Sequence, residues 1–161
     1  MKIKNLFFVF IRIIMVLALI CAIVFFVFMK HAETRKPFKE VKAQLKTSVT
    51  SIKMQPSTSR FLKKYYGLNA DDYTGVWLCA PVTNMDAEEL LLIKCKSEGQ
   101  IEATKDAILQ RQLTKQTTFE GYAPEQFELC QNYILDERGT FLLFIVAPDA
   151  EEIDAVFRNS F

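Results

Sequence analysis

The densest group of side chains that could do chemistry is the acidic segment at residues 84–89, with the sequence NMDAEE. Carboxylates at Asp86, Glu88 and Glu89 occupy three of four consecutive positions. Such a group could hold a hard cation such as Ca²⁺, or it could bind a basic partner. The alternative is that Thr83 or its neighbour caps a single helical turn whose N-terminus the acids favour, and this is the commoner origin of such a pattern.

A second candidate surface is the segment YAPEQ at residues 122–126, where Pro124 is suited to the first turn of a helix. Tyr122 precedes that helix and could either pack against the domain or be presented to a partner. The acidic segment is expected to join two strands, and connections of that kind lie at the surface. We therefore predict a binding surface formed by Asn84, Asp86, Glu88, Glu89, Tyr122 and Glu125.

The residue types that usually carry catalysis are sparse. The only histidine, His31, lies next to the apolar N-terminal segment, so the folded domain has no histidine to act as a general base. Ser59 and Lys63 are four residues apart, whereas a Ser-x-x-Lys nucleophile needs a spacing of three. We predict no catalytic residue, no cofactor and no metal site, and we expect the domain to be a non-enzymatic one.

The cysteines give no sign of a metal site. Cys79, Cys95 and Cys130 lack the C-x-x-C spacing and the histidine partners of a zinc site. Cys79 and Cys95 fall in successive predicted strands and could approach each other. The folded domain has three cysteines, and this odd number argues against a disulfide framework, so buried free thiols are expected.

The charge distribution restricts the partners of the chain. Its 161 residues leave room for one domain, and the net charge is only +1. Residues 30–64 hold ten Lys and Arg against two acids, a net +8, whereas residues 65–161 hold seven against seventeen, a net −10. This split indicates either a basic segment near an anionic surface or a basic segment packed on the acidic domain. Nucleic acid is not expected as a partner, because the acidic domain would repel phosphates.

The N-terminal segment has the pattern of a membrane anchor. Leu6 to Met29 is apolar except for Arg12, and as a helix it would be about 36 Å long, enough to cross a core of about 30 Å. It lacks a small-residue cleavage site, so an uncleaved anchor is expected. Cys21 follows Ile20 rather than a small residue, which argues against lipidation. Counting lysines and arginines on each side does not settle the orientation, because a short charged N-terminus is itself hard to export.

Helical and strand patterns follow the anchor. A stripe that begins at Phe38 and includes Val41, Leu45, Val49 and Ile52 has helical spacing, and its lysines could either lie on a membrane or flank a core-facing stripe. Core packing is the commoner case. The remaining predicted elements are a helix over 59–66 ended by a glycine, strands over 73–81 and 90–96, helices over 97–116 and 124–130, a hairpin of strands 133–135 and 140–147, and a final helix after 149.

Three of these predictions concern particular residues or short segments. Ser97 and Gln100 match a capping box for the helix that carries Ile101, Ile108 and Leu109 on one side. Asp149, together with the acid at position 152, is expected to cap the final helix. The apolar run 141–146 predicts a central strand covered on both faces.

These elements define the predicted fold class. It is α+β: a single N-terminal transmembrane helix followed by an antiparallel sheet of about four strands packed with helices.

Several short motifs resemble an uncharacterised family, a domain of unknown function. They are LKKYYGL at 62–68, DY at 72–73, TNMDAEEL at 83–90 and YAPEQ at 122–126, and the resemblance covers roughly Ser59 to Phe161. Members are bacterial envelope lipoproteins and membrane-anchored proteins of low-GC Gram-positive bacteria. The resemblance implies an extracytoplasmic location and supplies no activity. The chain departs from the lipoprotein members at Cys21, which implies a helical rather than a lipid anchor.

The resulting expectation has three segments: a membrane anchor at 1–30, a basic juxtamembrane helix or stalk at 31–58, and a small α+β domain at 59–161. We expect a single-pass protein of the bacterial cytoplasmic membrane with its C-terminal domain outside. Its partners would be membrane lipid, through the N-terminal helix, and an envelope protein. The expected role is an accessory or protein-interaction module. The alternative is an accessory subunit of envelope-polymer modification, or a weak hydrolase that uses Asp86 and Glu89.

Overall fold

The computed structural model describes residues 12–25, 36–51 and 53–161. Residues 12–25 are helical and expose their large apolar side chains. The expected span of residues 6–29 therefore extends beyond the described residues at both ends. Within the described ranges, no helix combines the length and the apolar character needed to cross a membrane. His31 and Ile52 also lie outside the described residues.

The sheet has five antiparallel strands in the order β1-β2-β3-β5-β4. They are β1 (Met54–Pro56), β2 (Gly75–Pro81), β3 (Glu89–Lys94), β4 (Ile134–Arg138) and β5 (Phe141–Val146). The α+β class and the antiparallel sheet are confirmed, but the predicted number of about four strands omitted β1. That strand is short and includes Pro56, which an edge position tolerates because one side of an edge strand donates no ladder hydrogen bond.

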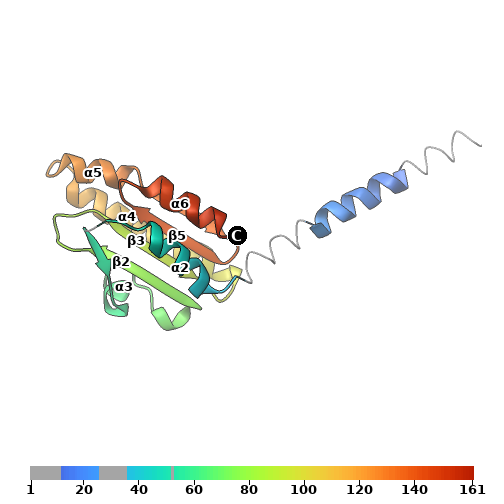
Figure 1. Ribbon diagram of the computed structural model, residues 1–161, viewed down its shortest axis with the longest axis horizontal. Coiled ribbons are helices and arrows are strands. Elements are labelled where there is room, and N and C mark those ends of the chain that lie inside the picture. The colour runs from blue at the N-terminus through green and yellow to red at the C-terminus, as the bar shows by residue number, and fades with distance from the viewer. Residues whose placement is uncertain (1–11, 26–35, 52) are drawn as a thin grey trace, which may run out of the picture.

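Helices cover both faces of the sheet (Figure 1). On one face lie α2 (Phe38–Ser48) and α6 (Ala150–Asn159), and on the other lie α3 (Ser59–Tyr66), α4 (Ile101–Phe119) and α5 (Pro124–Gln131). Short 3-10 turns occupy Ala70–Asp72 (η1) and Glu98–Gln100 (η2). Alternate residues of β5 join opposite cores, and all six are buried, so the prediction of a strand covered on both faces is confirmed.

The stripe on α2 packs into the core. Val41 and Leu45 are fully buried beside α6, while the Phe38 ring stacks on Phe141 at 6.4 Å between centroids. Phe38 also accounts for Gly75 of β2, because a Cβ at that position would lie 2.3 Å from Cγ of Phe38. Residues of α2 and β1, within the segment 31–58, therefore pack in the same core as the rest of the sheet.

Of three predicted helix caps, the one at Gly67 is observed and those at Ser97 and Asp149 are not. Gly67 ends α3 in the left-handed conformation, with φ 69°, as predicted. The capping box at Ser97 is wrong: Oε1 of Gln100 accepts a hydrogen bond from the amide of Lys96 at 2.7 Å, and no side chain caps α4. Asp149 does not cap α6 either, because its Oδ2 accepts a hydrogen bond from the Thr50 hydroxyl at 3.4 Å.

Candidate functional site

Strand alternation divides the acidic segment. Glu89 is the first residue of β3 and is fully buried, and Glu88 before it is only 3% exposed. The expectation that all three carboxylates lie at the surface is therefore wrong for these two. Successive residues of an extended chain point to opposite faces, so Glu89 faces α3 and α4, whereas Glu88 faces Ser51 and Lys53. Asp86 alone remains near the surface.

Glu89 is held by three side chains from two helices. Its Oε2 lies 3.0 Å from Nζ of Lys115 and 2.8 Å from Nη2 of Arg111, both on α4. Nε of Arg111 donates to Oε1 at 3.3 Å, and the hydroxyl of Tyr66 on α3 donates to the same oxygen. Arg111 and Lys115 are four residues apart, a spacing that places both on one face of α4. We call Tyr66, Glu89, Arg111 and Lys115 the buried charge cluster.

The environment fixes the charges in the cluster. Burial by itself would raise the pKa of Glu89, but Lys115 and Arg111 more than offset this and hold the pKa below its usual value. Burial, with Glu89 adjacent, raises the pKa of Tyr66 well above its ordinary value. Burial lowers the pKa of Lys115, an effect that Glu89 opposes. The cluster therefore contains one carboxylate, a neutral phenol and two basic groups.

A cavity of about 260 Å³ opens beside this cluster. The Arg111 guanidinium lies 4.6 Å from the ring centroid of Tyr65 and 5.8 Å from that of Phe61, so the cation stacks on an aromatic wall. Asp86 also lines the cavity, and its Oδ2 accepts hydrogen bonds from the Thr83 hydroxyl at 2.7 Å and from the Thr83 amide at 3.2 Å. The cavity is lined by Phe61, Tyr65, Pro81, Thr83, Asn84, Asp86, Arg111, Thr114, Lys115, Thr118 and Phe119.

Glu88 has a separate set of contacts. The hydroxyl of Ser51 donates to its Oε2, and Nζ of Lys53 lies 3.9 Å from its Oε1. These residues line an open hollow of about 440 Å³ together with Thr50, Pro148 and Asp149. The carboxylate of Glu88 therefore ties the chain between α2 and β1 to the start of β3.

The segment at Tyr122 approaches the acidic segment. The Tyr122 hydroxyl donates to Sδ of Met85 at 3.5 Å, and the side-chain oxygen of Gln126 accepts from the amide of Ala87 at 2.8 Å. Asn84 is exposed in the same loop, and Glu125 is exposed at the start of α5. Of the six predicted binding residues, four therefore remain accessible in two neighbouring segments: Asn84, Asp86, Tyr122 and Glu125.

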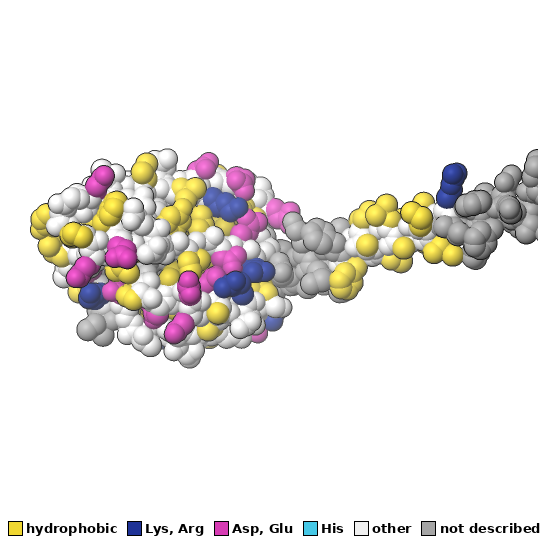
Figure 2. Space-filling view, turned by 90° about the horizontal axis from the view of Figure 1, so that it is seen from above, with side chains coloured by type: hydrophobic (Ala, Val, Ile, Leu, Met, Phe, Trp, Pro, Cys, Tyr) yellow, Lys and Arg dark blue, Asp and Glu magenta, His cyan; other side chains and the backbone are white. Residues whose placement is uncertain are grey.

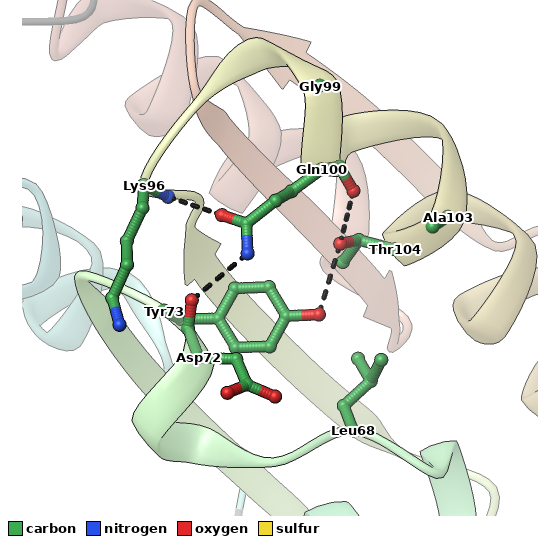
Figure 3. A pocket seen from close by; sticks show the side chains of 8 residues that line it. All are labelled: Leu68, Asp72, Tyr73, Lys96, Gly99, Gln100, Ala103 and Thr104. Atoms are coloured by element: carbon green, nitrogen blue, oxygen red, sulfur yellow. Dashed lines mark hydrogen bonds between the residues drawn. The ribbon is translucent and has the colours of Figure 1, made fainter.

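Another hollow, of about 410 Å³, is lined by residues of η1, η2 and α4 (Figure 3). Its polar groups largely bond to one another. The Gln100 amide donates to the carbonyl of Asp72 at 3.1 Å, and the hydroxyls of Tyr73 and Thr104 are 3.1 Å apart. This hollow is a hydrogen-bonded corner with few groups left for a ligand.

The domain cysteines are free and buried, as expected from the sequence. Cys79 and Cys95 do not approach each other, because Cys79 faces the core under α2 and Cys95 the core under α4. Burial raises the pKa of the Cys79 thiol to about 11 and also raises the pKa of Cys95 and Cys130. A raised pKa leaves little of the thiol ionised, and such thiols react poorly because the thiolate is the nucleophile.

Three cluster members were missed in the sequence: Tyr66, Arg111 and Lys115. The signal was the helical stripe itself, which is Ile101, Thr104, Ile108, Gln112, Lys115 and Phe119. Leu109, which we placed on the packed side, is 39% exposed instead. A lysine and a glutamine at core positions of a long helix indicate a buried polar contact.

Residues 46–147 match a protein-family model described as "Domain of unknown function (DUF4358)". The match begins near the end of α2 and continues past β5, so it spans the whole sheet and the cavity beside the buried charge cluster. No curated protein matches the chain, and no solved structure does.

Proposed function

The chain belongs to the DUF4358 family, whose description assigns no activity, and from the surface of the domain we propose that it is a membrane-anchored, extracytoplasmic protein-interaction module. Its partner is another protein of the cell envelope. The anchor rests on the apolar run Leu6 to Met29, and the location rests on the family resemblance and the short charged N-terminus.

The observation that carries the binding role is an apolar patch with an acidic rim. Val82, Met85 and Tyr122 are 46%, 53% and 66% exposed, and the bond between Tyr122 and Met85 joins the two segments into one surface. The half-buried carboxylate of Asp86 and the exposed carboxylates of Glu120 and Glu125 lie within a few residues of the patch in the sequence. We call these six residues the loop patch.

The loop patch has the make-up of a protein-binding surface. Exposed aromatic and methionine side chains supply most of the energy at such surfaces, and a polar rim surrounds them. The acids call for a partner with basic groups around an apolar centre. Figure 2 shows yellow side chains at the left-hand end of the domain, the end at which Figure 1 draws α5.

The geometry argues against a hydrolase that uses Asp86 and Glu89. A general acid needs a raised pKa, yet Lys115 and Arg111 hold the pKa of Glu89 below its usual value. The oxygens of Glu89 already accept bonds from three side chains, and the residue is fully buried. Glu89 therefore stabilises the fold beside the cavity.

The partner is tested by photocrosslinking in intact cells. A photoreactive phenylalanine analogue at position 122 should crosslink the full chain to one envelope protein, whereas the same analogue at Glu151, exposed on α6, should not. In the background of Asp86→Asn with Glu125→Gln the crosslink should weaken. Equal crosslinking from both positions would contradict the proposed surface.

The extracytoplasmic location of the domain is tested with C-terminal fusions. An alkaline phosphatase fused to the C-terminus should be active in intact cells, because the enzyme needs the oxidising exterior for its disulfides. An inactive phosphatase fusion together with a fluorescent C-terminal green fluorescent protein fusion would place the domain in the cytoplasm.

A further inference from the structure

The cavity beside the buried charge cluster carries both signs of charge without pairing them. Arg111, Lys115 and Asp86 all line it, yet among the described residues Asp86 forms no ion pair with either cation. In the described part of the chain, the hydrogen-bond donors to its carboxylate are the hydroxyl and the amide of Thr83. The lining of the cavity therefore combines two basic side chains with a carboxylate that pairs with neither of them among the described residues.

Arg111 and Lys115 have positive charge and N–H donors that Glu89 does not fully satisfy. Glu89 supplies one negative charge against Arg111 and Lys115. Within the described part of the chain, Nη1 of Arg111 has no hydrogen-bond partner, because Nε and Nη2 make the contacts to Glu89. Lys115 uses two of its three N–H groups, on Glu89 and on the carbonyl of Ala87. An anionic group in the cavity would meet the charge that Glu89 leaves unbalanced.

Part of the lining is apolar. Phe61 and Tyr65 pack with ring centroids 4.2 Å apart, and Pro81 and Phe119 also line the space. Its volume of about 260 Å³ is below the ~300–1,000 Å³ of sites for drug-sized ligands, so it suits a smaller molecule.

We propose that this cavity binds a free α-amino acid with an apolar side chain. The carboxylate of the ligand lies at Arg111 and Lys115, its ammonium group lies at Asp86, and its side chain packs on Phe61 and Tyr65. A free amino acid carries both charges on a small body, which is what unpaired opposite charges in a small cavity require. The two proposals share Asp86, which lies on the rim of the loop patch and also lines the cavity, whereas Tyr122 belongs to the loop patch alone.

The test is calorimetric titration of the full chain, purified in mild detergent, with three probes of matched shape. L-leucine carries both charges, 4-methylpentanoate lacks the ammonium group, and isoamylamine lacks the carboxylate. Leucine should bind at least about tenfold more tightly than either analogue. Asp86→Asn should remove the advantage of leucine over 4-methylpentanoate while leaving the affinity for 4-methylpentanoate unchanged or higher.

Two tryptophan substitutions outside the charge cluster distinguish a filled cavity from a misfolded domain. Thr118→Trp should fill the cavity and abolish leucine binding, and Thr117→Trp, at an exposed neighbouring position that does not line the cavity, should leave it intact. Tyr122→Ala should weaken the crosslink to the partner and leave leucine binding unchanged, so the two proposals fail separately. Equal binding of leucine and either analogue, leucine binding retained in Thr118→Trp, or no leucine binding up to about 10 mM would overturn the proposal.

Discussion

Replacing Glu89 by Gln tests whether the buried charge cluster holds the domain together. Glutamine keeps the shape of the side chain but removes the one negative charge that faces Arg111 and Lys115. Its amide nitrogen would also point a donor at groups that are themselves donors. The variant therefore leaves two basic groups buried without a counter-charge.

The expected loss is large. Removing one partner of a buried ion pair costs about 3–5 kcal/mol, and Glu89 is fully buried with bonds from three side chains. Small domains have unfolding free energies of about 5–15 kcal/mol, so the change takes a large part of the total. The melting temperature should fall by roughly 10–25 °C.

The assay is denaturant unfolding of the full chain, followed by tryptophan fluorescence. Trp77 is buried on β2 and reports on the core. Glu120→Gln is the matched control, because Glu120 is exposed and forms no ion pair among the described residues, and it should change stability by less than about 0.5 kcal/mol.

A second substitution separates charge from shape. Adding Lys115→Met to Glu89→Gln removes one of the unbalanced cations, so the double variant should be more stable than the sum of the single effects by about 1–3 kcal/mol. A Glu89→Gln variant as stable as Glu120→Gln would refute the charge argument.

Three further predictions concern the same domain. Because the folded-state pKa of Glu89 lies below its unfolded value of about 4.3, its contribution is present above that value and is lost as pH falls through the folded pKa. Unfolding free energy measured from pH 6 to about pH 2 should thus fall less steeply for Glu89→Gln than for the parent chain. Changing each of the three buried cysteines to Ala should cost about 1–2 kcal/mol in denaturant melts, and stoichiometric zinc in the purified chain would contradict a purely packing role. Gly75→Ala should cost about 1–3 kcal/mol because the added Cβ collides with Phe38, and in a Phe38→Ala background the same change should cost little, a result that additive losses would disprove.

The sequence predicted the fold better than the site. Apolar periodicity located β2, β3, β5 and the helices, because those patterns follow from burial on one or both faces. β1 escaped because three residues with a proline carry no such pattern, and it is defined only by pairing with β2. Local hydrogen bonds were the least predictable: Gln100 and Asp149 have cap-forming side chains but find other partners once the chain is folded.

The burial of Glu88 and Glu89 could not be predicted from the composition of their segment. Glu88 and Glu89 look like surface acids because nothing in the segment shows where β3 begins, and one residue of register decides which face each occupies. Their partners lie far along the chain, with Arg111 and Lys115 more than twenty residues later. The positions of Tyr122 and Asp86 near the surface could be predicted, because both residues lie in loop segments between elements.

The order of strands also bears on how the chain reaches this structure. The β2–β3 and β4–β5 pairs are each formed by strands close in sequence, whereas the seam between β3 and β5 joins chain segments separated by α4 and α5. Closing so long a loop is slow relative to forming a hairpin. We therefore expect two hairpins to form first and their docking along the seam to limit the folding rate. Glu89 pairs with Val146 at one end of that seam, so its carboxylate loses its water only when the two halves of the sheet meet.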